Sequence, residues 1–147
     1  MTQFKTIKTY IKLSYVPAAG RQEFIRSIIS NHVLEMERID APGSRPYAIK
    51  EALVFEVNED GLEFYPARSK VIAVPMPINN LDTLSESQVY AVAYDADLII
   101  CRVRLKAYGN NDLVELHSDA PGFSIVIAKK DIVAVWKVME LLEAGII

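Results

Sequence analysis

The chain has 147 residues, 51% hydrophobic and 24% charged, which is typical of one globular domain with a sizeable core and excludes a disordered chain. Its net charge of −3 argues against direct nucleic-acid binding, which needs a basic surface. The single cysteine excludes an internal disulfide, and there is no signal peptide and no apolar run of ~20 residues, so we expect a cytoplasmic protein without membrane contact.

The first fifty residues predict a strand, a short helix and a loop. Residues 7–15 alternate polar and apolar side chains loosely, as a strand does, and Pro17 ends the run. Apolar residues then recur at helical spacing, which predicts a short amphipathic helix over 22–31 that packs on the core. Turn formers predict a loop over 41–46. No helix-turn-helix is expected in this part of the chain.

From residue 52 onward the sequence predicts short strands separated by turns. The valine and isoleucine content of the last run, Ile132 to Leu142, favours a strand over a helix. The pattern indicates a mainly β fold, a largely antiparallel sheet or barrel, with one short N-terminal helix in a single domain over 1–147. The expected strands are 52–57, 70–74, 88–94, 98–105, 113–117, 124–128 and 132–142.

Two segments resemble the active-site segments of LexA-type self-cleaving repressors. The first is the run from Phe55 to Glu63, which contains Asp60-Gly61-Leu62, and the second is Ile100-Cys101-Arg102-Val103. The runs between 52 and 142 also follow each other in the order of the C-terminal peptidase domain of that family. The resemblance implies the LexA and signal-peptidase type of β fold.

The resemblance is degenerate at both catalytic positions, because the family has a serine at the position of Gly61 and a lysine at that of Cys101. In the family the serine attacks a peptide carbonyl after a buried lysine, whose pKa is lowered, removes its proton. Gly61 has no side chain to attack with, so the resemblance implies a pseudo-peptidase without a cofactor. The family cleaves itself at an Ala-Gly or Cys-Gly bond, and Ala19–Gly20 is then a vestigial cleavage bond.

Simpler interpretations exist for the same residues. Gly61 closes an Asn-Glu-Asp-Gly turn, where glycine accepts a positive φ at little cost. Cys101 alternates with Ile99 and Val103 on the apolar face of the expected strand, where a cysteine packs as a small hydrophobic side chain. An enzyme that uses Cys101 would need an accessible thiol.

The run His117-Ser118-Asp119 invites a triad interpretation. Consecutive strand residues point to opposite faces, so these three side chains do not easily converge. Glu115 and His117 share a face, but the chain has only two histidines and a metal site needs three or four ligands. We expect no metal and a polar strand end.

The expected function is therefore a catalytically inactive, phage-repressor-like module of a bacterium that regulates or binds other proteins, as in transcription regulation. The resemblance implies a homodimer through the C-terminal strand, Ile132 to Leu142. The alternative is a self-cleaving accessory subunit of a translesion polymerase, of the type that acts in SOS mutagenesis. That subunit has the same domain alone and would need a working serine and lysine.

Overall fold

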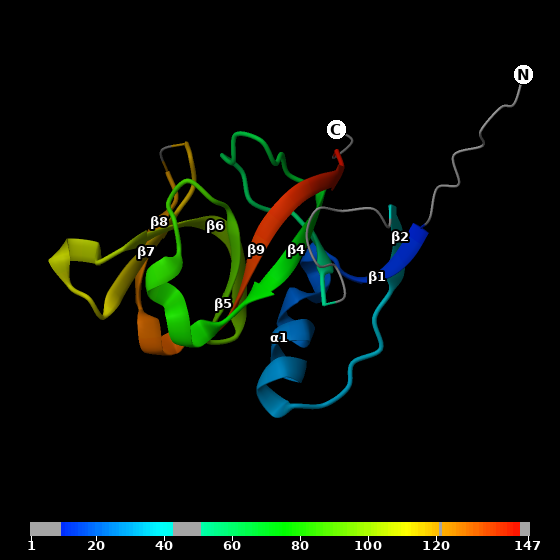
Figure 1. Cartoon of the computed structure of the whole chain (residues 1–147), viewed down its shortest axis with the longest axis horizontal. Coiled ribbons are helices and arrows are strands. Elements are labelled where there is room, and N and C mark those ends of the chain that lie inside the picture. Colours follow the sequence, from blue (N-terminus) through cyan, green and yellow to red (C-terminus); the bar gives the residue numbers. More distant parts are fainter. Residues whose placement is uncertain (1–9, 43–50, 121, 145–147) are drawn as a thin grey trace, which may run out of the picture.

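The computed structural model describes residues 10–42, 51–120 and 122–144. Within these residues the chain forms one mixed nine-stranded sheet and one α-helix, α1 (Arg21–Ser30), as Figure 1 shows. This confirms the expected mainly β fold with a short N-terminal helix. The strands are β1 (Tyr10–Val16), β2 (Arg38–Pro42), β3 (Leu53–Glu56), β4 (Lys70–Met76), β5 (Tyr90–Tyr94), β6 (Asp97–Leu105), β7 (Leu113–His117), β8 (Ser124–Ala128) and β9 (Ile132–Glu143).

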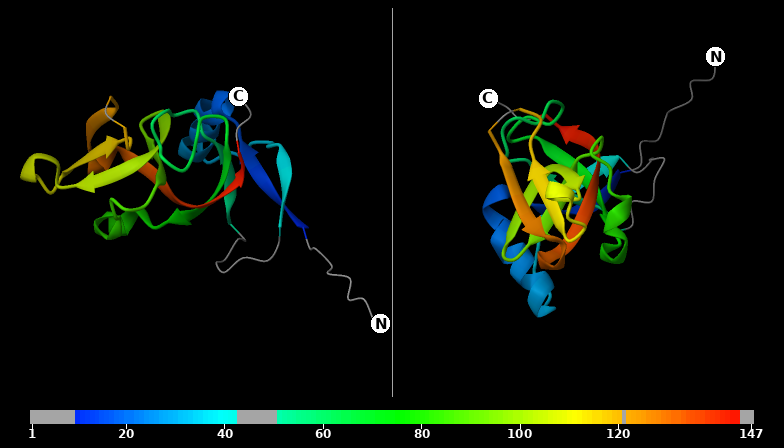
Figure 2. Two further views of the ribbon diagram at one scale, coloured as in Figure 1. Left: turned by 90° about the horizontal axis from the view of Figure 1, so that it is seen from above. Right: turned by 90° about the vertical axis from the view of Figure 1, so that its left-hand side faces the viewer.

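The strand order is β2-β1-β3-β4-β9-β5-β6-β7-β8, and every neighbouring pair is antiparallel except β1 with β3. The longest strand, β9, lies in the middle and pairs with β4 on one side and β5 on the other. The antiparallel pair of β1 and β2 and the turn between β6 and β7 lie at opposite ends of the long axis (Figures 1 and 2).

Three apolar clusters fill the space around the curved sheet. In the first, Phe24 of α1 packs against Phe55 and Trp136, with ring centroids 5.3 to 6.0 Å apart. The second gathers the other face of β5 and β6 with β7 and contains Tyr90 and Cys101. Burial of each large side chain stabilises the fold by about 1.5–3 kcal/mol, so these clusters fix the strands that carry the loops.

Most of the expected elements are found within one or two residues of their predicted ends, and the last run is a strand. Three local expectations are wrong. Ala41 and Pro42 belong to β2 and not to a loop, and Pro75 lies inside β4 and does not end it. On the predicted helix face, Phe24 and Ile25 are buried, but Ile29 is 56% exposed. Residues 7–9 and 43–46 of the predictions lie outside the described part.

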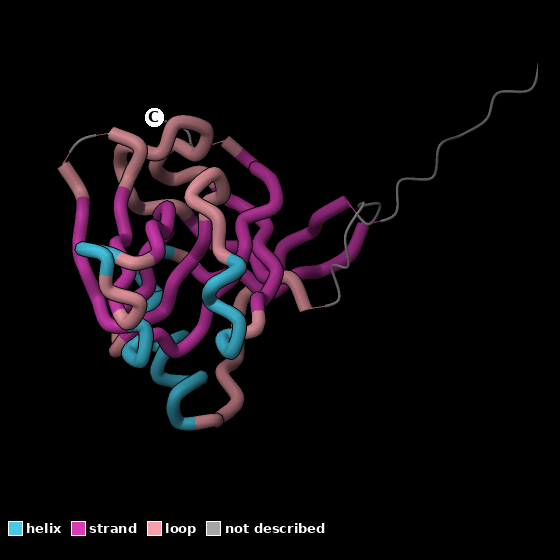
Figure 3. Tube along the Cα trace, turned by 60° about the vertical axis from the view of Figure 1, so that its left-hand side comes forward, coloured by secondary structure: helices cyan, strands magenta, loops and turns pink. Residues whose placement is uncertain are grey.

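Short helical turns join several strands, among them η1 (Ala18–Gly20), which leads directly into α1, and η3 (Ala107–Gly109) at the tip of the β6–β7 hairpin. Longer loops gather at one end of the sheet, as the tube in Figure 3 shows. In the described residues, no helix has the length and apolar character that a membrane crossing requires.

Candidate binding cleft

A cleft of about 370 Å³ opens between the loop that follows β3 and the loop that follows β7. Part of strand β6 also lines it. The lining contains both loops and one residue of the strand: Glu59, Asp60, Gly61, Ile100, Ser118, Ala120, Gly122 and Phe123. The two segments that resemble a peptidase active site therefore meet at one cleft.

Gly61 stands at the contact between the two loops. Its φ of +86° lies in the region that favours glycine. Its carbonyl oxygen accepts hydrogen bonds from the backbone N–H groups of Asp119 and Ala120, both at 2.9 Å. A Cβ atom at this position would lie 3.1 Å from the Cβ of Ala120 and 3.4 Å from the Oγ of Ser118. The second loop would thus crowd a side chain at position 61.

Strand β6 presents Ile100 to the cleft and turns Cys101 to the opposite face. Cys101 is fully buried among apolar side chains of the second cluster. Burial, and secondarily the nearby Glu59 carboxylate, raise the pKa of the thiol far above its usual value. The expectation that Cys101 packs as a buried hydrophobic residue is confirmed. A thiolate nucleophile is strongly disfavoured at this position.

Glu59 lines the inner wall of the cleft and forms an ion pair with Arg21. The side chains of Arg21 and Glu59 are only 11% and 17% exposed. Both guanidinium Nη atoms of Arg21 contact the Glu59 carboxylate, and they also donate to the carbonyl oxygens of Leu98 (3.2 Å) and Glu56 (2.7 Å). Oε2 of Glu59 accepts the backbone N–H of Ile100 at 2.8 Å.

The contacts of Arg21 and Glu59 satisfy backbone groups at the edge of β6. Strand β7 pairs with β6 only from Arg102 onward, so no strand of the described residues lies beside Leu98 and Ile100 on that side. The side chains of Arg21 and Glu59 bond carbonyl and N–H groups of this edge in place of a strand. They also fasten the start of α1 to the sheet, because Arg21 is the first residue of that helix.

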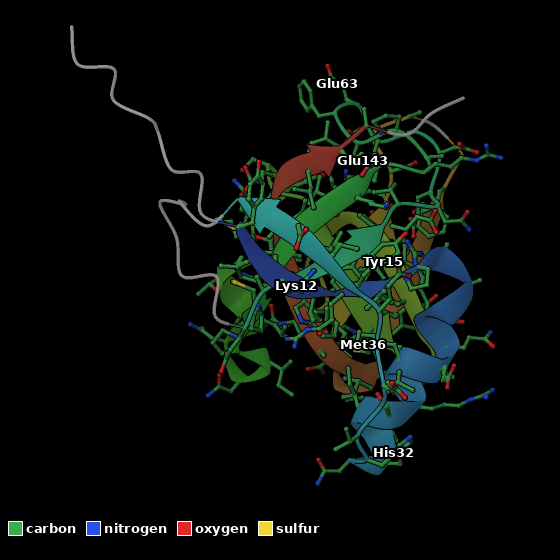
Figure 4. All side chains as sticks on the ribbon, turned by 90° about the vertical axis from the view of Figure 1, so that its right-hand side faces the viewer. Lys12, Tyr15, His32, Met36, Glu63 and Glu143 are labelled. Atoms are coloured by element: carbon green, nitrogen blue, oxygen red, sulfur yellow. The ribbon has the colours of Figure 1, made fainter. Side chains whose placement is uncertain are left out.

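The bond between Ala19 and Gly20 lies in the helical turn η1 that leads into α1. The N–H of Gly20 donates to the carbonyl of Pro17 at 2.9 Å, and the N–H of Ala18 donates to Oε1 of Glu56 at 2.7 Å. Gly20 lines a separate hollow of about 160 Å³, whose lining includes Tyr15 and Met36, labelled in Figure 4. The bond is therefore helical and outside the cleft, whereas a peptide that joins a sheet edge is extended.

A wider and more charged hollow of about 560 Å³ adjoins the cleft and shares Ser118, Ala120, Gly122 and Phe123 with it. Its wall contains the ion pair of Arg102 with Asp119, whose second carboxylate oxygen accepts the N–H of Glu63 at 2.8 Å. The Arg102 guanidinium and, more weakly, that N–H hold the pKa of Asp119 below its ordinary value.

The outer part of this hollow is a network around Arg104. Its guanidinium pairs with Glu86 at 2.8 Å and with Glu115 at 2.7 Å, and the arginine side chain is 51% exposed. The Arg104 hydrogen bond is the main cause that lowers the pKa of Glu86. The hydroxyl of Ser124 donates to Glu115 and is the main cause that lowers the pKa of that carboxyl.

The run His117-Ser118-Asp119 does not form a relay. The Nδ1 atom of His117 lies 3.0 Å from the Ser118 carbonyl, and its Nε2 atom lies 3.1 Å from Glu86 without the alignment of a hydrogen bond. The Ser118 hydroxyl donates to the carbonyl of Ala120 at 2.8 Å, away from the imidazole. No set of three or more His, Cys, Asp or Glu residues in the described part could hold a metal ion.

The role of the Arg21–Glu59 pair was not predicted from the sequence. Glu59 stands in the turn that closes on Gly61, and Arg21 follows a glycine 38 positions earlier, a separation at which no local pattern links two residues. The only local signal is an arginine at the start of a helix, where a cation is unfavourable unless it has a partner.

No protein-family model matches the chain, and no curated protein sequence matches it.

Proposed function

We propose that this protein is a catalytically inactive module with a LexA-type peptidase fold that binds an extended protein segment in the cleft and does not cut it. The observation that carries the proposal is the lining of the cleft. Where the resemblance expects a nucleophile there is Gly61, and Ala120 would crowd a side chain at this position. The β6 residue that faces the cleft is the apolar Ile100.

The remaining polar groups of the cleft support binding more than catalysis. A Ser-Lys peptidase needs a hydroxyl beside an amine of lowered pKa. Among the described residues of the lining, the one hydroxyl belongs to Ser118 and is bonded to a backbone carbonyl, and there is no lysine. Clefts of this size that combine apolar walls with a few fixed polar groups are the usual shape of a binding site.

The proposal includes a homodimer, as the resemblance implies, and places the protein in the bacterial cytoplasm with a regulatory role. The C-terminal strand has a limited part in such a dimer. Over Ile132 to Lys137, β9 is paired with β5 on one edge, and β4 pairs with it from Val135 to Glu143 on the other. Leu141, 41% exposed, lies beyond the pairing with β5. In the described part of the chain, this end is the portion of β9 that remains open on the β5 side for the contact that the resemblance implies.

The experiment uses a synthetic peptide with the sequence of residues 14–24, which contains Ala19–Gly20 in an unfolded form. We expect the peptide to shift the amide resonances of Gly61, Ile100 and Ala120 in the intact protein. Intact-mass measurement at alkaline pH is expected to find both the peptide and the protein uncut.

A cut at Ala19–Gly20 made by the purified protein would disprove the inactive assignment and favour the alternative of a self-processing polymerase subunit. The claim that the cleft binds a peptide is tested separately, by the amide resonances. If the peptide leaves the cleft resonances unchanged at millimolar concentration, the cleft does not bind extended segments of this kind.

A further inference from the structure

The two outer strands of the sheet differ in how they are protected against pairing with another chain. The edge strand β2 carries Arg38 and Asp40, the latter paired with Lys12 at 2.9 Å, and ends in Pro42, which has no backbone N–H. Charges and proline are the usual devices that keep an exposed edge from pairing. The opposite edge strand, β8, reads Ser-Ile-Val-Ile-Ala and has no charged residue and no proline.

The backbone of β8 is regular and presents one set of hydrogen-bonding groups outward. Its pairing with β7 runs without a register shift. The N–H of Lys129 bonds Asp112 and the carbonyl of Phe123 accepts from Ser118, so the odd-numbered residues of this segment face β7. The N–H and C=O groups of residues 124, 126 and 128 therefore point to the free edge. No residue in the described part of the chain forms a hydrogen bond with them.

The side chains of β8 continue the apolar surface to this edge. Ile125 and Ile127 pack at the margin of the second cluster and are only half-buried. Val126 lies on the other face, opposite Glu115 of β7, and is also half-buried. An exposed regular edge with apolar side chains on both faces is a template for another strand.

We propose that this edge pairs with β8 of a second copy of the chain, antiparallel about Val126. In this arrangement the outward groups of Ser124 meet those of Ala128 of the second copy, and Val126 meets Val126. Ile125 of one copy lies beside Ile127 of the other, which extends the half-buried apolar face. Every outward backbone group of the strand then gains a partner.

The charges at the two ends of β8 favour the antiparallel self-pairing. The strand is followed by Lys130, which is exposed and has no ion pair in the described part of the structure. Two-fold pairing about Val126 brings the turn after β8 of one copy, which contains Lys130, to the side of the segment before β8 of the other, which contains Gly122. Gly122 lines the charged hollow, which contains four carboxylates and two guanidinium groups. The four carboxylates are those of Glu63, Glu86, Glu115 and Asp119.

Each copy thus brings its free lysine to the acidic hollow of the other, and the contact is made twice by symmetry. A parallel arrangement would instead bring the two lysines together. Because the strand has five residues, the contact is smaller than a standard interface, and we expect a weak dimer with a dissociation constant on the order of 10–100 µM.

This inference rests on the homodimer of the proposed function and gives it a contact other than β9. The test is sedimentation equilibrium of the whole protein across the micromolar range. Val126→Lys and Val126→Glu are each expected to weaken dimerisation at least tenfold, because each places two like charges opposite each other at the symmetry axis. An equimolar mixture of the two variants is expected to dimerise again, since lysine then faces glutamate. Circular dichroism verifies that each variant is folded.

The matched control is Leu141→Lys at the end of β9, which is expected to leave dimerisation unchanged. If Leu141→Lys abolishes the dimer and Val126→Lys does not, the contact is at β9 and the β8 inference is overturned. A wild-type protein that is monomeric throughout overturns both contacts. Binding of the 14–24 peptide by Val126→Lys reports on the cleft separately, so the two proposals fail independently.

Discussion

Two arginine sites border the cleft region and use the same chemistry in different surroundings. On the inner wall, Arg21 and Glu59 are 11% and 17% exposed and bond the free edge of β6 as well as each other. On the outer hollow, Arg104 is 51% exposed and holds Glu86, which is 47% exposed. The inner pair, Arg21 with Glu59, bonds backbone groups of β6 that a neighbouring strand would otherwise bond. The outer pair, Arg104 with Glu86, lies on a solvent-exposed surface. Burial and backbone partners, more than the number of ion pairs, decide what each site contributes to the fold.

The largest effect is expected at the inner wall. Glu59→Ala leaves the Arg21 guanidinium without its carboxylate and the Ile100 N–H without an acceptor, so the free energy of unfolding should fall by about 3 kcal/mol. Urea unfolding followed by tryptophan fluorescence measures the change, since Trp136 lies in the cluster beneath α1. A loss below about 1 kcal/mol would mean that the inner pair is no stronger than a surface pair.

A second effect concerns Gly61, two residues beyond Glu59. Gly61→Ala forces a side chain into a positive φ and against Ala120, and should destabilise the fold by about 2–3 kcal/mol. Gly109→Ala is the matched control, because Gly109 has a φ of +71° but no heavy atom within 4 Å of the added Cβ. Gly109→Ala should lower the free energy of unfolding only through its unfavourable positive φ, by about 1 kcal/mol. Thermal unfolding of both variants isolates the contribution of the second loop.

If Gly61→Ala and Gly109→Ala cost the same, the second loop moves aside freely and the crowding argument for a lost nucleophile fails. The double variant Gly61→Ala with Ala120→Gly should recover part of the difference, because it removes the nearer of the contacting side chains.

Strands defined by local patterns were predicted from the sequence, whereas strands that depend on distant partners were not. β7 and β8 begin and end at the predicted residues, because local alternation and adjacent turns define them. β2 was missed because Arg38–Pro42 is polar and contains proline, and becomes a strand only by pairing with β1, nearly thirty residues away. Pro75 is tolerated inside β4 because β3 pairs only as far as Ala73 and leaves one side of β4 open there.

In the candidate site, too, the features set by local alternation were predicted and those set by tertiary contacts were not. Strand alternation correctly predicted that Cys101 is on the buried face, and it follows that Ile100 is the residue toward the cleft. Gly61 lines the cleft, whereas Cys101, the second position that the resemblance singled out, packs in the second cluster on the opposite face of β6. The inner pair joins Arg21 of α1 to Glu59 in the loop after β3, a tertiary contact between residues 38 positions apart that no periodicity records.

Asp119 lies between the two sites and should show an intermediate, pH-dependent effect. Its pKa is lowered in the folded protein by Arg102, so its contribution to stability is present above the unfolded pKa of about 3.9 and is lost as pH falls through the folded value. Asp119→Asn should lower the stability at pH 7 by about 1–2 kcal/mol and flatten the acid side of the stability profile. Urea unfolding at pH 7 and at pH 3 measures both. If the free energy of unfolding changes equally between these pH values in the wild type and in Asp119→Asn, Arg102 does not stabilise the charged form of this carboxylate.

The smallest effect is expected at the outer site. Arg104→Ala removes two ion pairs, but the arginine is half-exposed and water replaces its contacts, so the free energy of unfolding should fall less than in any of the other variants. Salt should weaken whatever remains, since exposed pairs are screened within ~10 Å at 0.1 M ionic strength. Urea unfolding of Arg104→Ala beside Glu59→Ala at two salt concentrations makes the comparison directly. Equal losses, with equal salt dependence, would mean that the two arginine sites do not differ, and that the inner pair does not stand in for a strand.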